Sequence, residues 1–397
     1  MDKQEKVSVS KTRIGVLAVS MMGMAALAIT PSYAAIARTF SLTNTGVQML
    51  TSLPNLFMML AGIIIGKLTA SRFNLKNLTL LAILLVTIGG LLPLAFHTNF
   101  AFLVFCSCLV GLGQGACTNL TQVLISQILP KKERESTMGL STTFINIGGV
   151  VFIMGGGQLA SMSSWVNNYW IYLFSLLILL VVLVLLPFRP KVLEQNQADG
   201  LSTKIVLNKY VFYSALWAFL TMLLNNVLNN NISLFVVHEH LGATTQAAFT
   251  STISLIGGML CGLVVGLIGK RFKYSSIALS FFIYGLAYLL IGVFHSLLIV
   301  FVGSFLVGAA MSIAMGQFPY LISISVADNS VSMALGIYVA IYSIGGVISP
   351  FVINPLTSLV KNMGLNVFSV SGILALVIGC VCLLAKYQKN LVNNAQA

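Results

Sequence analysis

Long apolar stretches separated by short polar segments make up almost the whole chain. Each stretch holds roughly 20 residues or more, and a helix of that length crosses about 30 Å of hydrocarbon. The charged residues fall between the stretches or at their ends. The pattern predicts an all-α membrane protein with twelve transmembrane helices, at residues 14–36, 46–69, 76–96, 100–129, 137–160, 164–187, 209–237, 244–268, 274–294, 297–325, 332–356 and 365–385.

The second half of the chain repeats the first, with an offset of 197 to 200 residues. The repeat pairs Gly62 and Gly66 with Gly262 and Gly266, Arg72-Phe73 with Arg271-Phe272, and Ile147-Gly148-Gly149-Val150 with Ile344-Gly345-Gly346-Val347. We therefore expect two pseudo-symmetric six-helix bundles, at residues 1–187 and 209–397, joined by a polar cytoplasmic linker at 188–208. Duplicated bundles of this kind are typical of secondary transporters, whose halves rock about a site held between them.

The composition places these helices in a bilayer. The 397 residues have a mean hydropathy of +0.98 and only 7% are charged, against about a quarter in soluble domains. The net charge of +13 does not indicate nucleic-acid binding, because 19 of the 21 Lys and Arg residues lie on one side of the predicted topology, leaving Arg38 and Lys361 on the other. This positive-inside bias predicts a multi-pass cell-membrane protein with both termini in the cytoplasm.

No motif of an enzyme is present in the sequence. It contains no Gly-rich phosphate loop, nucleophile elbow or Cys/His spacing typical of a metal site. His238-Glu239-His240 lacks the spacing of a metalloprotease. We therefore expect no catalytic residue, cofactor or metal, and a function that depends on a small-molecule substrate and the lipid bilayer.

Several local motifs resemble the major facilitator superfamily along essentially the whole chain. Gly66 to Lys76 resembles the family's loop after the second span, with Ser71 in place of its usual Asp, and the second copy has Lys270 there. Leu129 to Arg134, followed by Gly139, resembles the loop between spans four and five. The resemblance implies twelve spans in two bundles, a protein that works as a monomer, and conformational roles for the loop residues Arg72, Arg134 and Arg271.

Two shorter motifs resemble branches within the family. Gly148 and Gly156-Gly157 match the outer glycines of the fifth-span antiporter motif of drug and metabolite exporters, with Phe152-Ile153 in place of its central Gly-Pro. Ser52-Leu53-Pro54 resembles the cyanate and nitroimidazole transporter branch. The first of these motifs favours export over uptake.

All eight acidic residues lie in loops or at span ends, and no Lys or Arg lies at the centre of a span. A buried charge is costly and is kept where it has a use, such as carrying protons. We therefore expect a uniporter or exchanger, or coupling through an outer histidine or the charge of the substrate. The site should have a neutral polar lining.

In the family, spans one, four, seven and ten surround the substrate cavity, which implies a set of lining residues here. Amides and Thr would supply one polar side and methionines a soft apolar side. The alternatives for the asparagines are hydrogen bonds to neighbouring helices or a locally broken helix. The candidate substrate-binding residues are Met24, Gln114, Thr118, Gln122, Asn146, Asn225, Asn226, Asn229, Asn230, Met311, Met315, Tyr338 and Tyr342.

Three functions fit these observations. The leading hypothesis is a secondary transporter of a small organic solute, amphipathic or neutral, working by alternating access, with export favoured. The second is uptake or exchange of an organic anion, such as a carboxylate or a bile-salt-like amphipath, held by neutral donors. The third is a membrane sensor that keeps the fold without transporting.

Overall fold

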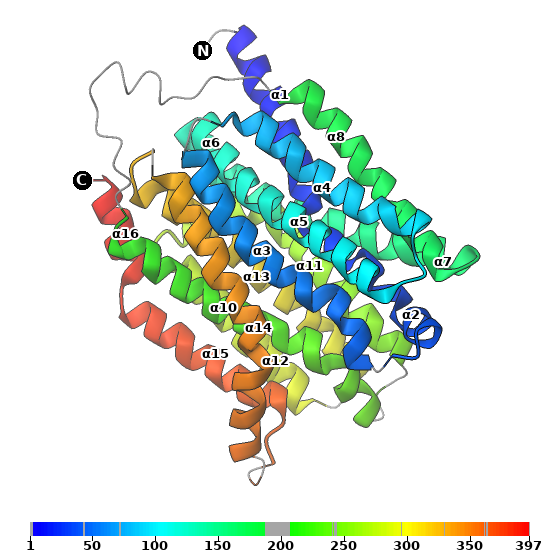
Figure 1. The fold of residues 1–397 in the computed structure, drawn as a ribbon. Coiled ribbons are helices and arrows are strands. Elements are labelled where there is room, and N and C mark those ends of the chain that lie inside the picture. The colour runs from blue at the N-terminus through cyan, green and yellow to red at the C-terminus, as the bar shows by residue number, and fades with distance from the viewer. Residues whose placement is uncertain are drawn as a thin grey trace. The chain divides into compact units, whose positions relative to one another are not determined.

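The computed structural model describes residues 3–42, 44–70, 73–186, 207–239, 241, 244–294, 296–328, 330–360, 362 and 364–396. Arg72 and almost all of the predicted linker, 188–206, lie outside these ranges. The described residues form helices and no strand (Figure 1). In the first half these are α1 Lys3–Ser20, η1 Met21–Ser32, α2 Tyr33–Thr39, α3 Asn44–Ala70, α4 Leu75–Ala95, α5 Phe100–Ile128, α6 Lys131–Val150, η2 Val151–Gly155, α7 Gly156–Met162, η3 Trp165–Tyr172 and α8 Leu173–Leu185. In the second half they are α10 Lys209–His238, α11 Thr244–Arg271, α12 Ser276–Val293, α13 Leu297–Ser325, α14 Val331–Leu359, α15 Val367–Leu384 and α16 Tyr387–Gln396.

The predicted number of membrane helices is confirmed for the part of the chain that the structure describes. It contains 12 helical segments long and apolar enough to cross a membrane, from Ser10–Ser32 to Val367–Asn394. The largest differences from the predicted ranges occur where polar residues extend a helix. The fifth span, for example, begins at Lys132 instead of 137, because the charged turn after Pro130 is already helical.

The chain divides into two compact units by its internal contacts. The first unit is Met1–Arg134, Phe144–Leu207 and Val326–Ala340, and the second is Glu135–Thr143, Asn208–Ser325 and Ile341–Ala397. Helices α6 and α14 therefore contribute residues to both units. Each unit is described separately below.

In the first unit, α5 packs closely between α3 and α4 (Figure 1). Glycines on α5 make this approach possible. A Cβ atom added at Gly111 would lie 2.5 Å from the Pro54 carbonyl oxygen of α3, and one at Gly113 would lie 2.6 Å from the Ala82 carbonyl oxygen of α4. Side chains larger than hydrogen would therefore force these helices apart.

In the second unit, α11 and α13 cross with their backbones in contact. A Cβ at Gly257 would lie 2.2 Å from the Phe305 carbonyl oxygen, and one at Gly308 would lie 1.8 Å from the Ser254 carbonyl oxygen. Further along α11, Gly262 and Gly266 lie against residues of α6 in the same unit. The glycines of α11 that belong to the sequence repeat therefore lie on a packing surface.

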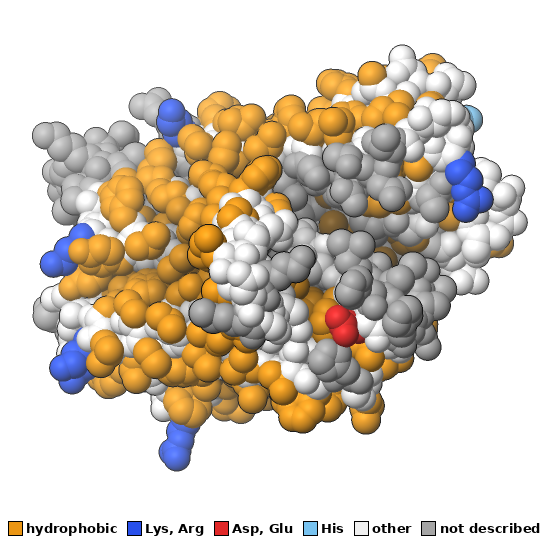
Figure 2. All heavy atoms as spheres, turned by 90° about the horizontal axis from the view of Figure 1, so that it is seen from below, with side chains coloured by type: hydrophobic (Ala, Val, Ile, Leu, Met, Phe, Trp, Pro, Cys, Tyr) orange, Lys and Arg blue, Asp and Glu red, His pale blue; other side chains and the backbone are white. Residues whose placement is uncertain are grey.

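Large apolar side chains remain exposed on the surface of both units. Val184 is 80% exposed, Phe351 76% and Leu298 71%, values that a water-soluble surface would not favour. Figure 2 shows a face covered by hydrophobic side chains, with Lys and Arg side chains at its margins. Together with the 12 apolar helices, this surface is that of a multi-pass membrane protein.

Candidate functional site

The first span is broken near its middle. Met24 has φ −129° and ψ 18°, outside the helical region, and the segment that follows is wound as a tighter 3₁₀ helix, η1. Pro31, within this segment, has no N–H to donate to a helix hydrogen bond. The Thr30 hydroxyl donates to the Leu27 carbonyl at 2.8 Å. The first span therefore contains both a backbone break at Met24 and a proline that cannot donate.

Gln114 of α5 is hydrogen-bonded to the segment that follows the break. Its Oε1 atom accepts a hydrogen bond from the Ala26 backbone N–H at 2.7 Å, and its Nε2 atom lies 3.2 Å from the Met58 sulfur of α3. The side chain is 5% exposed. One amide thus joins η1, α5 and α3, with its carbonyl committed to the backbone and its N–H groups facing only a weak acceptor.

The fifth span packs against the first span close to the break. A Cβ at Gly148 of α6 would lie 2.0 Å from the Met21 carbonyl oxygen, so the two backbones touch there. A π-helical turn, η2, follows at Val151–Gly155. Such turns often occur at functional sites in helices. The Gly148 contact and this irregular turn therefore both lie beside the broken span.

The polar row on α5 continues beyond Gln114. The Thr118 hydroxyl donates to the Gln114 backbone carbonyl at 3.0 Å, within its own helix. Gln122 is 7% exposed, and its Oε1 atom has no hydrogen-bond partner among the described residues. Asn119 is fully buried, and neither of its amide atoms has a partner there either. Sequence reasoning did not select Asn119, although its polarity one turn from Gly115 was a usable signal.

In the second unit, the asparagines of α10 point in different directions. The Tyr284 hydroxyl of α12 donates to Asn225 Oδ1 at 3.2 Å, whereas Asn226 donates to the Met222 carbonyl of its own helix at 3.0 Å. Asn229 and Asn230 are exposed. The alternative of hydrogen bonding to a neighbouring helix therefore describes Asn225. A substrate-binding role for these residues stays a prediction.

The remaining predicted lining residues differ in burial. Met24, Met311 and Met315 are half-buried, whereas Asn146, Tyr338 and Tyr342 are buried. Met24, Asn146 and Tyr338 belong to the first unit, and the other three to the second. Within the first unit, Gln114 binds the broken span at Ala26, two residues beyond Met24.

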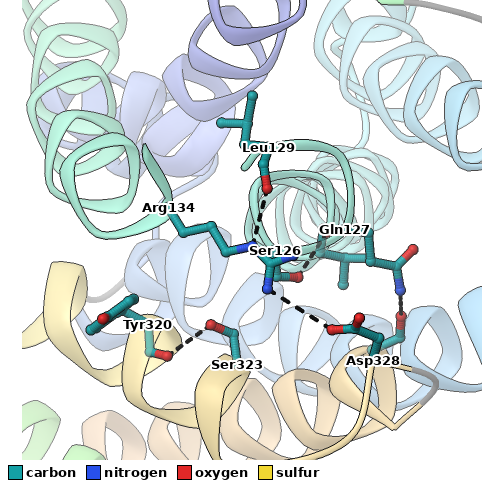
Figure 3. A network of polar contacts seen from close by, with 9 residues as sticks. Ser126, Gln127, Leu129, Arg134, Tyr320, Ser323 and Asp328 are labelled. Carbon is teal, nitrogen blue, oxygen red and sulfur yellow. Dashed lines mark hydrogen bonds and ion pairs between the residues drawn. The ribbon is translucent and has the colours of Figure 1, made fainter. Parts of the chain in front are cut away.

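Arg134 is the centre of a polar network in the first unit (Figure 3). It is 8% exposed, and its Nε atom donates to the Leu129 carbonyl at 3.1 Å. A guanidinium nitrogen lies 3.9 Å from a carboxylate oxygen of Asp328. Nearby, Gln127 donates to the Ser332 hydroxyl at 2.9 Å. These contacts join α5 and the start of α6 to α14 and the segment before it. A conformational role for Arg134 stays a prediction. Arg271, in contrast, is exposed at the end of α11.

We expect Arg134→Gln to destabilise the protein far more than Asp328→Asn. The Arg134 side chain is 10% exposed and anchors the Leu129 carbonyl, whereas the Asp328 side chain is 69% exposed. Exposed ion pairs contribute only about 0–1 kcal/mol, but a buried group left without its partner costs about 1–3 kcal/mol. Melting temperatures of the purified variants test this order. Equal losses would show that the ion pair, and not the loop anchor, supplies the stability.

The glycines of the second span also contact α14 in the first unit. A Cβ at Gly336 would lie 2.5 Å from the Gly62 carbonyl oxygen and 3.1 Å from Gly66 Cα. Helices from the two halves of the sequence therefore meet here through small residues. Comparison with protein families adds the deciding observation: residues 15–350 match the model of the Major Facilitator Superfamily.

The chain belongs to the major facilitator superfamily. Membership of this family indicates a membrane transporter and not an enzyme. The predicted fold class is confirmed with it, since solved structures of this family superimpose on nearly the full chain.

Individual relatives are distant. The glucose transporter GlcP of Staphylococcus epidermidis is 26% identical over 156 residues, which are 38% of this chain and about a third (35%) of GlcP. The human organic anion transporter MFSD10 has a TM-score of 0.75 at 14% identity, over 94% of this chain and 99% of that one. The proton:xylose symporter XylE, bound to 6-bromo-6-deoxy-D-glucose, has a TM-score of 0.69 at 17% identity, over 96% and 95%. At these low sequence identities, the structural similarity shows a common fold.

Proposed function

We propose that this major facilitator protein is a secondary transporter of a small neutral organic solute that carries hydroxyl groups beside an apolar part. The observation that carries this proposal is that buried side-chain amides of α5 have polar atoms without strong hydrogen-bond partners among the described residues. Among the described residues, the Gln114 N–H groups bond only to a sulfur atom, and the amides of Asn119 and Gln122 have atoms without a partner. Buried amides of this kind need polar partners, and a hydroxylated solute supplies both donors and acceptors.

The charge pattern supports a neutral solute over an anion. The sequence has no Lys or Arg at the centre of a span to pair with a carboxylate. A buried anion without a cationic partner would pay a large desolvation cost. The presence of a glucose transporter among the relatives agrees with this solute class. The likeness to the organic anion transporter is a likeness of the fold alone.

The proposed mechanism is alternating access between bundles 1–187 and 209–397, with both termini in the cytoplasm. Gly62 and Gly336 let α3 and α14 approach without interlocking side chains, and Gly262 and Gly266 do the same for α11 and α6. Smooth helix faces can separate and close again at low cost, because few side chains need to repack. The broken first span supplies a second flexible element beside Gln114.

Counterflow in proteoliposomes tests this function. Vesicles containing the purified protein are loaded with an unlabelled hexose, pentose, polyol or organic anion, and uptake of the labelled compound is followed. We expect saturable counterflow of a neutral hydroxylated solute, unchanged by a proton uncoupler because no mid-span carboxylate carries protons. Exchange of organic anions alone would contradict the proposed solute. Lack of counterflow with any compound in a broad panel would favour a sensor without transport activity.

A further inference from the structure

A chain of buried side-chain hydrogen bonds in the second unit leads from the C-terminal helix α16 to an acidic residue of α6. Gln388 Nε2 donates to the Ser276 hydroxyl at 2.8 Å, Ser276 donates to Gln317 Oε1 at 3.2 Å, and Gln317 Nε2 donates to Glu135 Oε1 at 3.2 Å. Gln388, Ser276 and Gln317 are at most 3% exposed. The four residues lie on α16, α12, α13 and α6, so the chain joins helices that are far apart in sequence.

The chemistry of the groups fixes the direction of this chain. Gln388 Oε1 accepts the Ile277 backbone N–H at 3.2 Å, and its Nε2 also donates to the Lys273 carbonyl at 3.1 Å. A backbone N–H can only donate, so the amide orientation of Gln388 is set by Ile277. Ser276 therefore accepts from Gln388 and uses its single O–H toward Gln317. This leaves the Gln317 N–H groups for the Glu135 carboxylate.

Glu135 lies against a glycine of α11, Gly269. A Cβ at Gly269 of α11 would lie 1.8 Å from Glu135 Oε1 and 2.4 Å from Gln317 Nε2, so this pair occupies the space that a side chain at Gly269 would fill. Lys270, the next residue of α11, attracts the carboxylate electrostatically. The carboxylate is half-buried, and its hydrogen bond from Gln317 offsets part of the cost of removing the charge from water.

Helix α16 is firmly docked on the same unit. Lys386, in the left-handed region with φ 49°, turns the chain after α15. Tyr387, Leu391 and Val392 of α16 are then buried, each 5% exposed or less. The hydroxyls of Tyr387 and Ser214 are hydrogen-bonded to each other, as are Asn394 and the Tyr210 hydroxyl. Lys389 and Asn390 face outward. The amphipathic helix thus places Gln388 inside the unit.

We propose that Gln388 is a positioning residue of the transport cycle. By orienting Gln317 through Ser276, it holds Glu135 and stabilises the state in which the start of α6 packs against α11 and α13. Docking of α16 then slows the separation of these helices. The inference requires a transporter that changes conformation, but it does not depend on the solute proposed above.

Hydrogen–deuterium exchange on the full-length protein tests this coupling without a substrate. We expect Gln388→Leu to speed exchange of backbone amides in residues 135–143 by a factor on the order of ten, the effect of losing one hydrogen bond to a charged group. Gln317→Leu should have the same effect, and the double variant should add nothing, because both substitutions break one chain. Lys389→Ala, on the outward face of α16, is the matched control and should leave this exchange unchanged.

A second substitution keeps the test decisive if Gln388→Leu prevents folding. Ser276→Ala breaks the chain between Gln388 and Gln317 without altering α16, and it should speed exchange in residues 135–143 as well. Faster exchange confined to α16 would overturn the proposal, because Gln388 would then only dock its own helix. Effects of Gln388→Leu and Gln317→Leu that add in the double variant would overturn it too. Neither result bears on the counterflow assay.

Discussion

Gly308→Leu should prevent the protein from accumulating as a folded species. A Cβ at this position of α13 would lie 1.8 Å from the Ser254 carbonyl oxygen and 2.6 Å from its carbonyl carbon. Both are backbone atoms of α11, so no side-chain rotation relieves the clash. Overpacking in a core that can adjust costs about 1–3 kcal/mol, and here the two helices must separate along their crossing. Size-exclusion chromatography of the detergent-solubilised protein measures the result as loss of the monodisperse peak.

Val302→Leu is the matched control for this substitution. Val302 lies on the same helix and is 47% exposed, so the additional methylene meets no backbone. The control should give a normal peak and an unchanged melting temperature. A normal peak for Gly308→Leu as well would mean that α11 and α13 do not cross at these atoms.

The sequence predicted the fold because the bilayer leaves so few choices. Within hydrocarbon, backbone groups must be satisfied internally, so each apolar run of sufficient length becomes a helix. Gly262 and Gly266 of α11 were visible in the sequence as part of the repeat, and in the structure they pack against α6. The closest approach to a backbone atom at a described glycine, however, is between Gly308 and Ser254. Their pairing depends on how α13 lies across α11, which glycine spacing in one helix does not specify.

The candidate site was less predictable, because polarity in a sequence does not show which hydrogen bonds are already made. Gln114 and Met24 were predicted to line one site, and Gln114 binds Ala26, two residues beyond Met24 in the broken first span. A shared site for the two stays a prediction. The sequence could not show that the Gln114 carbonyl caps Ala26, nor that Asn225 accepts from Tyr284. Asn119 received no role, although its buried amide lacks a partner among the described residues.

Glu135 shows the same limit for a charged residue. By position it is a span-end carboxylate, as the hydropathy pattern indicated. In the structure it lies against Gly269 of α11 and accepts from Gln317 of α13. The Glu135 carboxylate fits there because Gly269 has no side chain. The sequence does not show this contact, because it depends on how α6 packs against α11.

Gln114→Met should reduce transport strongly while the protein still folds. Methionine has nearly the volume of glutamine but cannot accept the Ala26 N–H, which Gln114 Oε1 now accepts at 2.7 Å. A buried donor without a partner costs about 1–3 kcal/mol, equivalent to about a 5- to 150-fold change in an equilibrium between conformations. The substitution also removes the N–H groups proposed to reach the solute. Counterflow at equal protein content should therefore fall by at least about tenfold.

Thr79→Val is the matched control, since it removes a buried hydroxyl from the neighbouring helix α4. That hydroxyl donates only to the Leu75 carbonyl of its own helix, at 2.7 Å, and its loss leaves no buried N–H unsatisfied. The control should transport at close to the normal rate. Equal losses for Thr79→Val and Gln114→Met would show a general sensitivity of this unit to lost polar groups.

Met58→Leu distinguishes the roles of the two ends of the Gln114 amide. Only the Nε2 end contacts the Met58 sulfur, at 3.2 Å, so the cap on Ala26 remains and the melting temperature should stay unchanged. The N–H groups then lose their weak competing acceptor, and the apparent KM for a hydroxylated solute should fall. A rise in KM with an unchanged melting temperature would mean that the solute binds beside the Met58 sulfur and not at the Gln114 amide.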